Sequence, residues 1–254
     1  AGQVTVAGDF KGQMWFDNTS ITSMPDPLTL MPGFDVFIVS YDQSGTLLWV
    51  RQGAAKYTDR AIDVVSDPVG DIYVTGQFSD TITFDQPHPN GIYNATFLVK
   101  YSAAGQEQWF LRYGGALFTH VRDLVIAPGG DLLLAGDARG DLFYLDDQPD
   151  VVPMDGDHAC YVLRTDPDGQ LLSAVSIGSD HPVSVGGIAL AGDSLAMLGT
   201  FQCAFSGMQD HYGTGPFTAT GQQDLFIARF HGDDLQFTQA QQFGGQDAKR
   251  AGGI

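Results

Sequence analysis

The sequence has few cysteines, no long apolar run and no recognisable targeting segment. Two cysteines among 254 residues, Cys160 and Cys203, exclude a disulfide-built scaffold, and they leave open whether they form one bridge or stay as thiols. No apolar run approaches the roughly 20 residues that a transmembrane helix needs. No signal peptide is present and Ala1 begins in a strand-like run, so we expect a processed or trimmed piece of a longer chain.

Basic residues are also scarce. Twelve Lys and Arg against 30 Asp and Glu give a formal net charge of −18, which argues against nucleic acid and anionic lipid as partners. The same surplus could favour cationic partners or divalent ions, although a solvated acidic surface in saline or extracellular surroundings explains it more simply. The 43% hydrophobic and 17% charged content is that of a globular chain with a real core.

The spacings of known catalytic and metal sites are missing. None of the six histidines forms an H-x-x-x-H pair, the two cysteines form no C-x-x-C, and no G-x-S-x-G elbow occurs. The acidic segments LDDQPD (145–150) and MDGDH (154–158) offer oxygen ligands to Ca²⁺ but match neither an EF-hand nor a calcium-binding nonapeptide repeat. We therefore expect no catalytic residue, no metal site and no cofactor, with Ca²⁺ as the alternative.

What the sequence does contain is an internal repeat. Three series of glycines recur at steps of about 60 to 68 residues, which is longer than a WD40 or kelch unit. One series ends VTVAG-like runs, one lies in turns such as YDQSGTLLW, and one closes each unit. Their members are Gly8, Gly76, Gly136 and Gly199; Gly45, Gly105 and Gly169, with a degenerate fourth turn around Asp234; and Gly53, Gly114, Gly178 and Gly244.

Each unit holds four short runs rich in β-branched and aromatic residues, and none shows helical periodicity. In the clearest unit these runs are 61–66, 71–78, 95–101 and 108–113. Four-strand units in tandem predict an all-β fold, a β-propeller of four-stranded antiparallel blades. A β-sandwich would also give many short strands, but not this repeat.

The two ends of the chain match complementary parts of one repeat unit. RAGGI at 250–254 aligns with SVGGI at 184–188, and residues 1–52 match a unit from its second strand onward. We therefore predict one propeller domain, 1–254, with blade units 53–114, 115–178 and 179–244 and a closing blade from 245–254 plus 1–52. If the terminal strands close one sheet, the blades number four, and no edge strand stays open. A fragment of a longer array remains the alternative.

Turns within a unit are short, whereas the links between its second and third strands are long. These links, 17–34, 85–94, 146–158 and 206–223, vary in sequence and are rich in Pro, Gly, Asp and His. Up-and-down strands place them at one end of the sheets together with the connections between units. Any binding surface is expected at this end.

TDRAIDVVSDPVGDIYVTG followed by ATFLVKYSAAGQEQW resembles the bacterial SBBP β-propeller repeat, with Asp71 where Asn is usual. FDVFIVSYDQSGTLLW and QDLFIARF carry the same third-strand signature, and the likeness weakens from 115 to 222. The resemblance implies an exported or cell-surface bacterial protein, often one module of a longer chain. It transfers no catalytic residue.

Two groups of residues are candidates for binding. Arg60, His120, Ser184 and Arg250 start the innermost strand of successive units, where they would contact an anion or carboxylate, unless each pairs with a nearby acid such as Asp59, Asp63 or Asp247. The aromatic residues of the connections would contact protein or glycan. These are Tyr57, Tyr93, Phe118 and Tyr212.

From these features we expect a non-enzymatic binding, interaction or structural module. Its partner would be a protein or glycan ligand on the long-link end, alongside other domains of a longer parent chain. The alternative is a polysaccharide-active hydrolase or lyase that uses loop carboxylates, whose separation cannot be obtained from a sequence.

Overall fold

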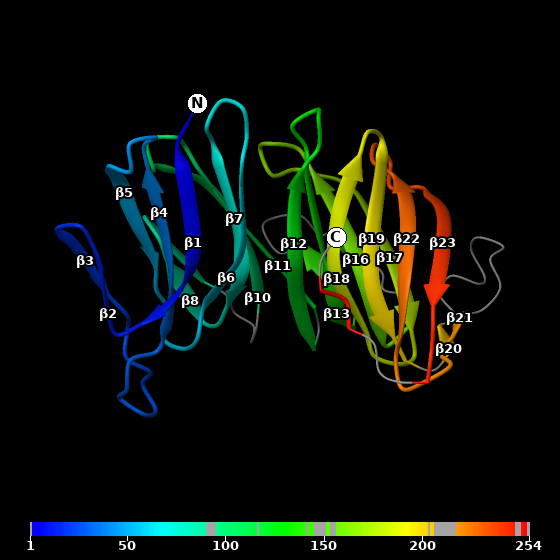
Figure 1. Ribbon diagram of the computed structural model, residues 1–254. Coiled ribbons are helices and arrows are strands. Elements are labelled where there is room, and N and C mark those ends of the chain that lie inside the picture. Colours follow the sequence, from blue (N-terminus) through cyan, green and yellow to red (C-terminus); the bar gives the residue numbers. More distant parts are fainter. Residues whose placement is uncertain are drawn as a thin grey trace. The chain divides into compact units, whose positions relative to one another are not determined.

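The computed structural model describes residues 2–89, 95–115, 117–140, 142–144, 151–152, 156–202, 204–205, 217–246 and 250–252 (Figure 1). The chain divides into two compact units, residues 1–114 and 115–254, and each is described by itself. In the described part, no helix is long and apolar enough to cross a membrane.

The first unit contains two antiparallel sheets. One has the strand order β1-β4-β5, and in the other the order runs β6-β7-β10-β11. Their bounds are β1 (Val4–Lys11), β4 (Phe34–Tyr41), β5 (Leu47–Gly53), β6 (Arg60–Ser66), β7 (Ile72–Phe78), β10 (Ala95–Tyr101) and β11 (Glu107–Gly115).

Two four-stranded antiparallel sheets make up the second unit, in the orders β12-β13-β16-β17 and β18-β19-β22-β23. The strands are β12 (Phe118–Ile126), β13 (Leu132–Arg139), β16 (His158–Thr165), β17 (Leu171–Ser179), β18 (Val183–Ala191), β19 (Ser194–Phe201), β22 (Asp224–His231) and β23 (Phe237–Phe243).

These up-and-down sheets confirm the predicted class: the chain is an all-β protein with a β-propeller fold of antiparallel blades. The four strands predicted for the clearest unit coincide with β6, β7, β10 and β11. In the described residues the first sheet has three strands, and residues 250–252 lie in none. Ala251 instead packs against Gly186 of β18. Closure of the first blade by 245–254 therefore stays a prediction, because 247–249 and 253–254 lie outside the described residues.

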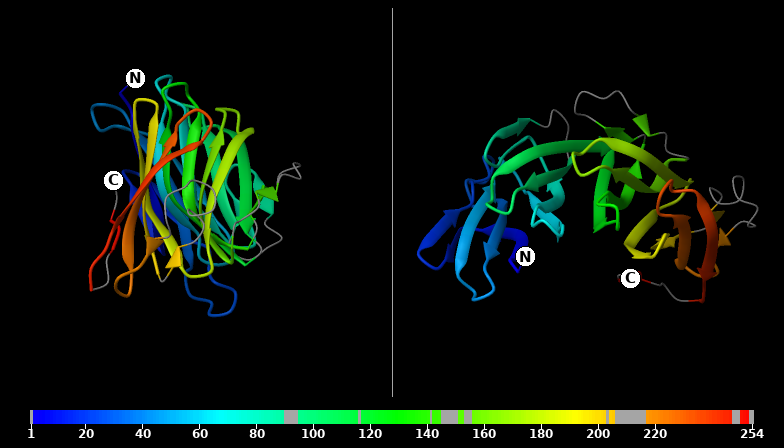
Figure 2. Two further views of the ribbon diagram at one scale, coloured as in Figure 1. Left: turned by 90° about the vertical axis from the view of Figure 1, so that its right-hand side faces the viewer. Right: turned by 90° about the horizontal axis from the view of Figure 1, so that it is seen from above.

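The two sheets of each unit face one another (Figure 2), and the buried side chains of the core lie between them. In the first unit Val36 and Ile38 of β4 pack with Val74 of β7 and Phe97 of β10, all fully buried or nearly so. The third-strand aromatics predicted as core are indeed inside. Phe97, Tyr161 and Phe226 are fully buried, and Phe37 is half-buried.

Short turns join the strands at one end of each sheet. Gly45, Gly105 and Gly169 have φ of 83°, 74° and 88°, the left-handed region in which glycine is least strained. The fourth turn is the degenerate one, and there Leu235 takes φ of 57° without a glycine. Its side chain is buried, so packing holds a conformation that a leucine would otherwise avoid.

The long links contain more structure than the sequence predicts. Each contains the second strand of a small antiparallel pair, where we expected a loop, and the first strand of the pair precedes the link. The pairs are β2 (Gln13–Phe16) with β3 (Thr19–Thr22), β8 (Thr81–Thr83) with β9 (Pro87–Pro89), β14 (Leu142–Tyr144) with β15 (Val151–Val152), and β20 (Ala204–Phe205) with β21 (Phe217–Thr218). Apolar residues of these pairs cover the end of the core: Ile82 is fully buried, and Phe16 rests on Phe37.

Candidate functional site

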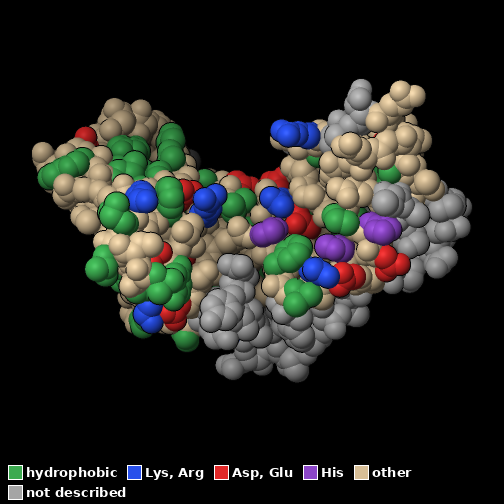
Figure 3. Space-filling model, turned by 90° about the horizontal axis from the view of Figure 1, so that it is seen from below, with side chains coloured by type: hydrophobic (Ala, Val, Ile, Leu, Met, Phe, Trp, Pro, Cys, Tyr) green, Lys and Arg blue, Asp and Glu red, His purple; other side chains and the backbone are tan. Residues whose placement is uncertain are grey.

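The end of each unit that carries the long links is the candidate site. Figure 3 views this end, and on the unit formed by residues 115–254 histidine, basic and acidic side chains lie close together among hydrophobic ones. The residues responsible are described below, first for the unit formed by residues 1–114 and then for the other.

The first link exposes an unusual number of large apolar side chains. Leu28 and Leu30 are 81% and 80% exposed, Trp15 and Met31 are 61% and 60% exposed, and Met24 is 42% exposed. All five lie within 20 residues of sequence on β2 and the segment that leads into β4. Scattered exposed leucines are normal, but a cluster on one link is typical of a binding surface.

Hydrogen bonds fix the tip of this link. Pro25 and Pro32 form an antiparallel bridge, and the backbone of Asp26 bonds with both Met31 and Leu30. The Asp26 carboxylate also accepts the amide N–H of Leu28 at 2.7 Å. Leu30 has φ of 58°, a strained conformation for leucine. Residues 24–33, the tip loop, therefore present their apolar side chains from a defined backbone.

Two basic residues lie beside the base of the tip loop. Lys11 of β1 and Arg60 of β6 are both exposed, and each lies 5.7 Å from the ring centre of Phe34. Phe34 follows Gly33 directly, and its carbonyl accepts the N–H of Asp59 at 2.8 Å. Gly33 in turn packs against the carbonyl of the half-buried Tyr57. Tyr57 and Arg60, both predicted as binding residues, thus border one surface.

Beneath this surface lie two buried carboxyl groups. Asp59 is fully buried, and its burial raises its pKa to about 8 even though it accepts the N–H of Ser79. Burial also raises the pKa of Asp35, which accepts bonds from the Met24 N–H and the Gln52 amide. At neutral pH Asp59 is therefore mostly protonated, so it does not neutralise Arg60 as the sequence alternative supposed.

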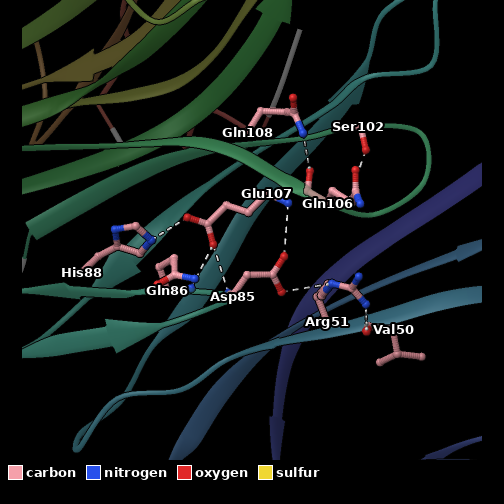
Figure 4. A network of polar contacts seen from close by, with 9 residues as sticks. All are labelled: Val50, Arg51, Asp85, Gln86, His88, Ser102, Gln106, Glu107 and Gln108. Carbon is pink, nitrogen blue, oxygen red and sulfur yellow. Dashed lines mark hydrogen bonds and ion pairs between the residues drawn. The ribbon is translucent and has the colours of Figure 1, made fainter.

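A second polar network joins the hairpin β8–β9 to its neighbours (Figure 4). His88 Nε2 lies 2.6 Å from Glu107 Oε1, and the other oxygen of Glu107 accepts the backbone N–H groups of Asp85 and Gln86. Asp85 accepts the N–H of Glu107 and pairs with Arg51 at 3.2 Å. The His88 ring also stacks on Phe110 at 3.9 Å. The network ties β5, β8–β9 and β11 together.

This network does not resemble a hydrolytic carboxylate pair. Burial alone would raise the pKa of Glu107, but the His88 hydrogen bond and charge and two backbone N–H groups hold it below its usual value. A general acid for glycoside cleavage needs the opposite, a raised pKa. The sequence also contains two adjacent carboxylate pairs. Asp233 and Asp234 are exposed on a short turn, and Asp146 and Asp147 lie outside the described residues.

In the second unit the polar site centres on Asp137 of β13. Its nearly buried carboxylate accepts Arg122 Nε at 2.8 Å and Ser184 Oγ at 3.1 Å, and His120 Nδ1 lies 3.1 Å away. Burial would raise the pKa of Asp137, yet the His120 and Arg122 contacts outweigh it and hold that pKa below its usual value. The group is therefore an ionised anchor for β12 and β18.

Aromatic and charged side chains extend this cluster. Phe118 lies 5.1 Å from the ring of His120 and 6.3 Å from the ring of His158. Beside it, Arg139 pairs with Asp157 at 2.8 Å. The sequence analysis missed Arg122 and Asp137. Arg122 is the extra residue of a β-bulge in β12, which turns its side chain toward Asp137, and no sequence spacing signals that bulge.

The predicted site residues thus fall into four groups. Tyr57 and Arg60 border one surface of the first unit. Phe118, His120 and Ser184 meet around Asp137 in the second unit, so His120 and Ser184 do contact an acid, although none of those named from sequence. Arg250 is exposed and isolated among the described residues. Tyr93, Tyr212 and Asp247 lie outside the described residues, so their predicted roles stay predictions.

In the part of the chain that the structure describes, no three His, Cys, Asp or Glu side chains gather as a metal ion would require. Segment 145–150 lies outside that part, and Asp157 of the second acidic segment is engaged by Arg139. Cys160 is a buried free thiol, and its burial raises its pKa. Cys203 lies outside the described residues.

Comparison with known proteins yields distant likeness only. No family model matches the chain. An uncharacterized WD repeat-containing protein of Acanthamoeba polyphaga mimivirus is 28% identical over 120 residues, covering 40% of this chain and 8% of its own length. A crystal structure of a protein of unknown function from Bacteroides caccae has a TM-score of 0.36 and 10% identity, covering 81% of this chain and 68% of that one. The chain thus spans only a small part of the curated relative that it matches.

Proposed function

We propose that this chain is a non-enzymatic interaction module that binds a protein partner through the tip loop of its first unit. The proposal is carried by the exposure of Met24, Leu28, Leu30 and Met31 on the tip loop, whose backbone is fixed by hydrogen bonds, and of Trp15 on the preceding strand β2. Buried apolar surface supplies most of the affinity at protein interfaces, and a preformed loop binds with less loss of conformational entropy.

Export to the cell surface or beyond is part of the same proposal. It is supported by the likeness of the repeats to the SBBP family and by the acidic composition, with a net charge of −18. The module would then act beside other domains of a longer parent chain. A glycan is a less suitable partner for the tip loop, since leucine and methionine give little directional recognition of hydroxyl groups.

Site-specific photo-crosslinking tests the proposal. A photoreactive phenylalanine analogue at position 28 should give a discrete protein adduct in cells that produce the chain. The matched control places the analogue at Val69, which is 78% exposed in a short turn at the other end of the same unit. Adducts at both positions alike, or at neither, would refute a partner site on the tip loop.

A further inference from the structure

The cations at the base of the tip loop differ from most others in this chain. Six basic residues have a carboxylate within ion-pairing distance: Arg51, Lys56, Lys100, Arg122, Arg139 and Arg164. Lys11 and Arg60 have none among the described residues, although the chain carries 30 acidic side chains against 12 basic ones. Arg229 and Arg250 also have none there, but only Lys11 and Arg60 lie against the same aromatic ring. Because acidic residues outnumber basic ones in this chain, two unpaired cations against one aromatic ring need a specific explanation.

The two cations are held where a ligand can reach them. Both side chains are exposed, and the ring of Phe34 supports each at 5.7 Å. The acid next to Arg60 in the sequence, Asp59, is fully buried, with its pKa raised by that burial. Asp9, two residues before Lys11 on β1, is exposed and lies beyond ion-pairing distance of it. Neither of these two neighbouring acids therefore forms an ion pair with Lys11 or Arg60.

The cation pair and the apolar tip loop are continuous. The loop closes through the bond from Gly33 N–H to Met24 carbonyl, and the next residue is Phe34, on which both cations rest. One partner segment can therefore bring a carboxylate to Lys11 or Arg60 while its apolar side chains meet the tip loop. An arginine and a lysine that rest on one ring suit a carboxylate because the charge-assisted hydrogen bonds are short and directional.

We propose that Lys11 and Arg60 on Phe34 form the charge-recognising part of the tip-loop surface, and that its partner is a protein segment combining an acidic side chain with large apolar ones. This inference rests on the proposed function and names the partner class. The net charge of −18 repels an acidic partner at long range and slows its approach. The contribution of Lys11 and Arg60 is therefore to the position and specificity of the bound segment, not to the rate of association.

The test uses a phage-displayed library of short random peptides, selected on the full chain. Selected peptides should combine Asp or Glu with Leu, Ile, Phe or Met. The affinity of a synthetic copy should fall about tenfold to hundredfold in the variant Lys11→Gln with Arg60→Gln. A peptide in which the acid is replaced by its amide should bind the wild type more weakly by the same factor. Its affinity for the double variant should change little, because the charge that the acid contacts is already gone.

The matched control is Arg229→Gln, which removes an exposed charge in the other unit and should leave the affinity unchanged. Unchanged thermal unfolding shows that each variant is folded, and Arg60→Lys, which keeps the charge, should bind at least partly. Selection of peptides without acids, or equal binding by the double variant, overturns the inference. If the double variant Leu28→Ser with Met31→Ser abolishes peptide binding in that case, the tip loop remains the interaction surface and only the charge-recognition inference fails. Peptides whose affinity changes in neither double variant contradict the charge-recognition inference and the proposed function together.

Discussion

Gly76 of β7 lies directly opposite Phe97 of β10, and the Phe97 ring fills the space that a side chain at position 76 would need. A Cβ at position 76 would come within 2.6 Å of that ring. The same register places Gly8 opposite Phe37, Gly136 opposite Tyr161 and Gly199 opposite Phe226. These four glycines, which recur once in each repeat unit, are thus required because an aromatic ring of the neighbouring strand packs against each of them.

Gly76→Ala is accordingly expected to destabilise the first unit by about 1–3 kcal/mol, because Phe97 and the backbone at Arg60 must move to admit the methyl group. Gly129→Ala is the matched control, since a Cβ there meets nothing within 4 Å. Urea unfolding of both variants gives the two free energies. Equal values would contradict a packing role for the glycine.

Much of the fold follows from such repeated residues. The glycines, the turn aspartates and the alternating apolar runs each recur in phase, so one complete unit predicts the strands of the others. The strand pairs in the long links do not follow, because the second strand of each pair differs from link to link: Thr19–Thr22 and Pro87–Pro89 share no pattern. Their pairing depends on the core end that they cover, which is a tertiary effect.

The candidate site was predictable only in part. In the sequence, Arg60 and His120 are selected because each starts an innermost strand. What decides their environment is not local in sequence: Asp137 reaches His120 from the neighbouring strand, and Phe34 lies under Arg60 from another sheet. The exposure of Leu28 and Leu30 was also hidden, because an apolar residue in a sequence gives no sign of whether it packs inward.

Asp123 joins the two sheets of the second unit. Its carboxylate accepts the N–H of Ile188 in β18 at 2.7 Å and the N–H of Leu124 on its own strand. Asp123→Ala should lower the free energy of unfolding by about 1–3 kcal/mol, because the Ile188 N–H loses its acceptor. The exposed Asp168→Ala serves as control. Thermal unfolding that shifts equally in both variants would contradict this role.

A glutamine on the outer strand recurs as the partner of a buried aspartate. Gln52 donates to Asp35 at 2.6 Å and to the Thr22 carbonyl, and Gln242 donates to Asp224 at 2.8 Å and to the Thr218 carbonyl. Gln52→Ala and Gln242→Ala should each cost about 1–3 kcal/mol, since an aspartate without exposed surface loses a donor.

The exposed Gln239 of β23 offers the control for this pair, and its replacement by Ala should change stability little. Hydrogen exchange gives a second measurement: the link hairpins β2–β3 and β20–β21 should lose protection in the respective variants, because the same glutamine holds the hairpin carbonyl. Uniform loss of protection over the whole unit would indicate a general packing defect instead.

The raised pKa of Asp59 makes the first unit sensitive to pH. Burial raises this pKa from 3.8 to about 8, so between these values the folded state keeps a proton that the unfolded state has released. Stability from this group is therefore full below pH 3.8 and is lost progressively as the pH rises, by about 1.4 kcal/mol per pH unit, until the carboxyl ionises near pH 8.

Asp59→Asn keeps an acceptor for the Ser79 N–H but cannot ionise. The stability difference, wild type minus variant, should therefore fall from about pH 4 to about pH 8 and stay constant above that range, measured by urea unfolding at each pH. Asp59→Leu separates charge from hydrogen bonding: it should share the pH profile of the Asn variant at lower stability throughout, because the N–H loses its acceptor. Parallel curves for wild type and Asp59→Asn would show that the carboxyl ionises in the folded state as it does in the unfolded one.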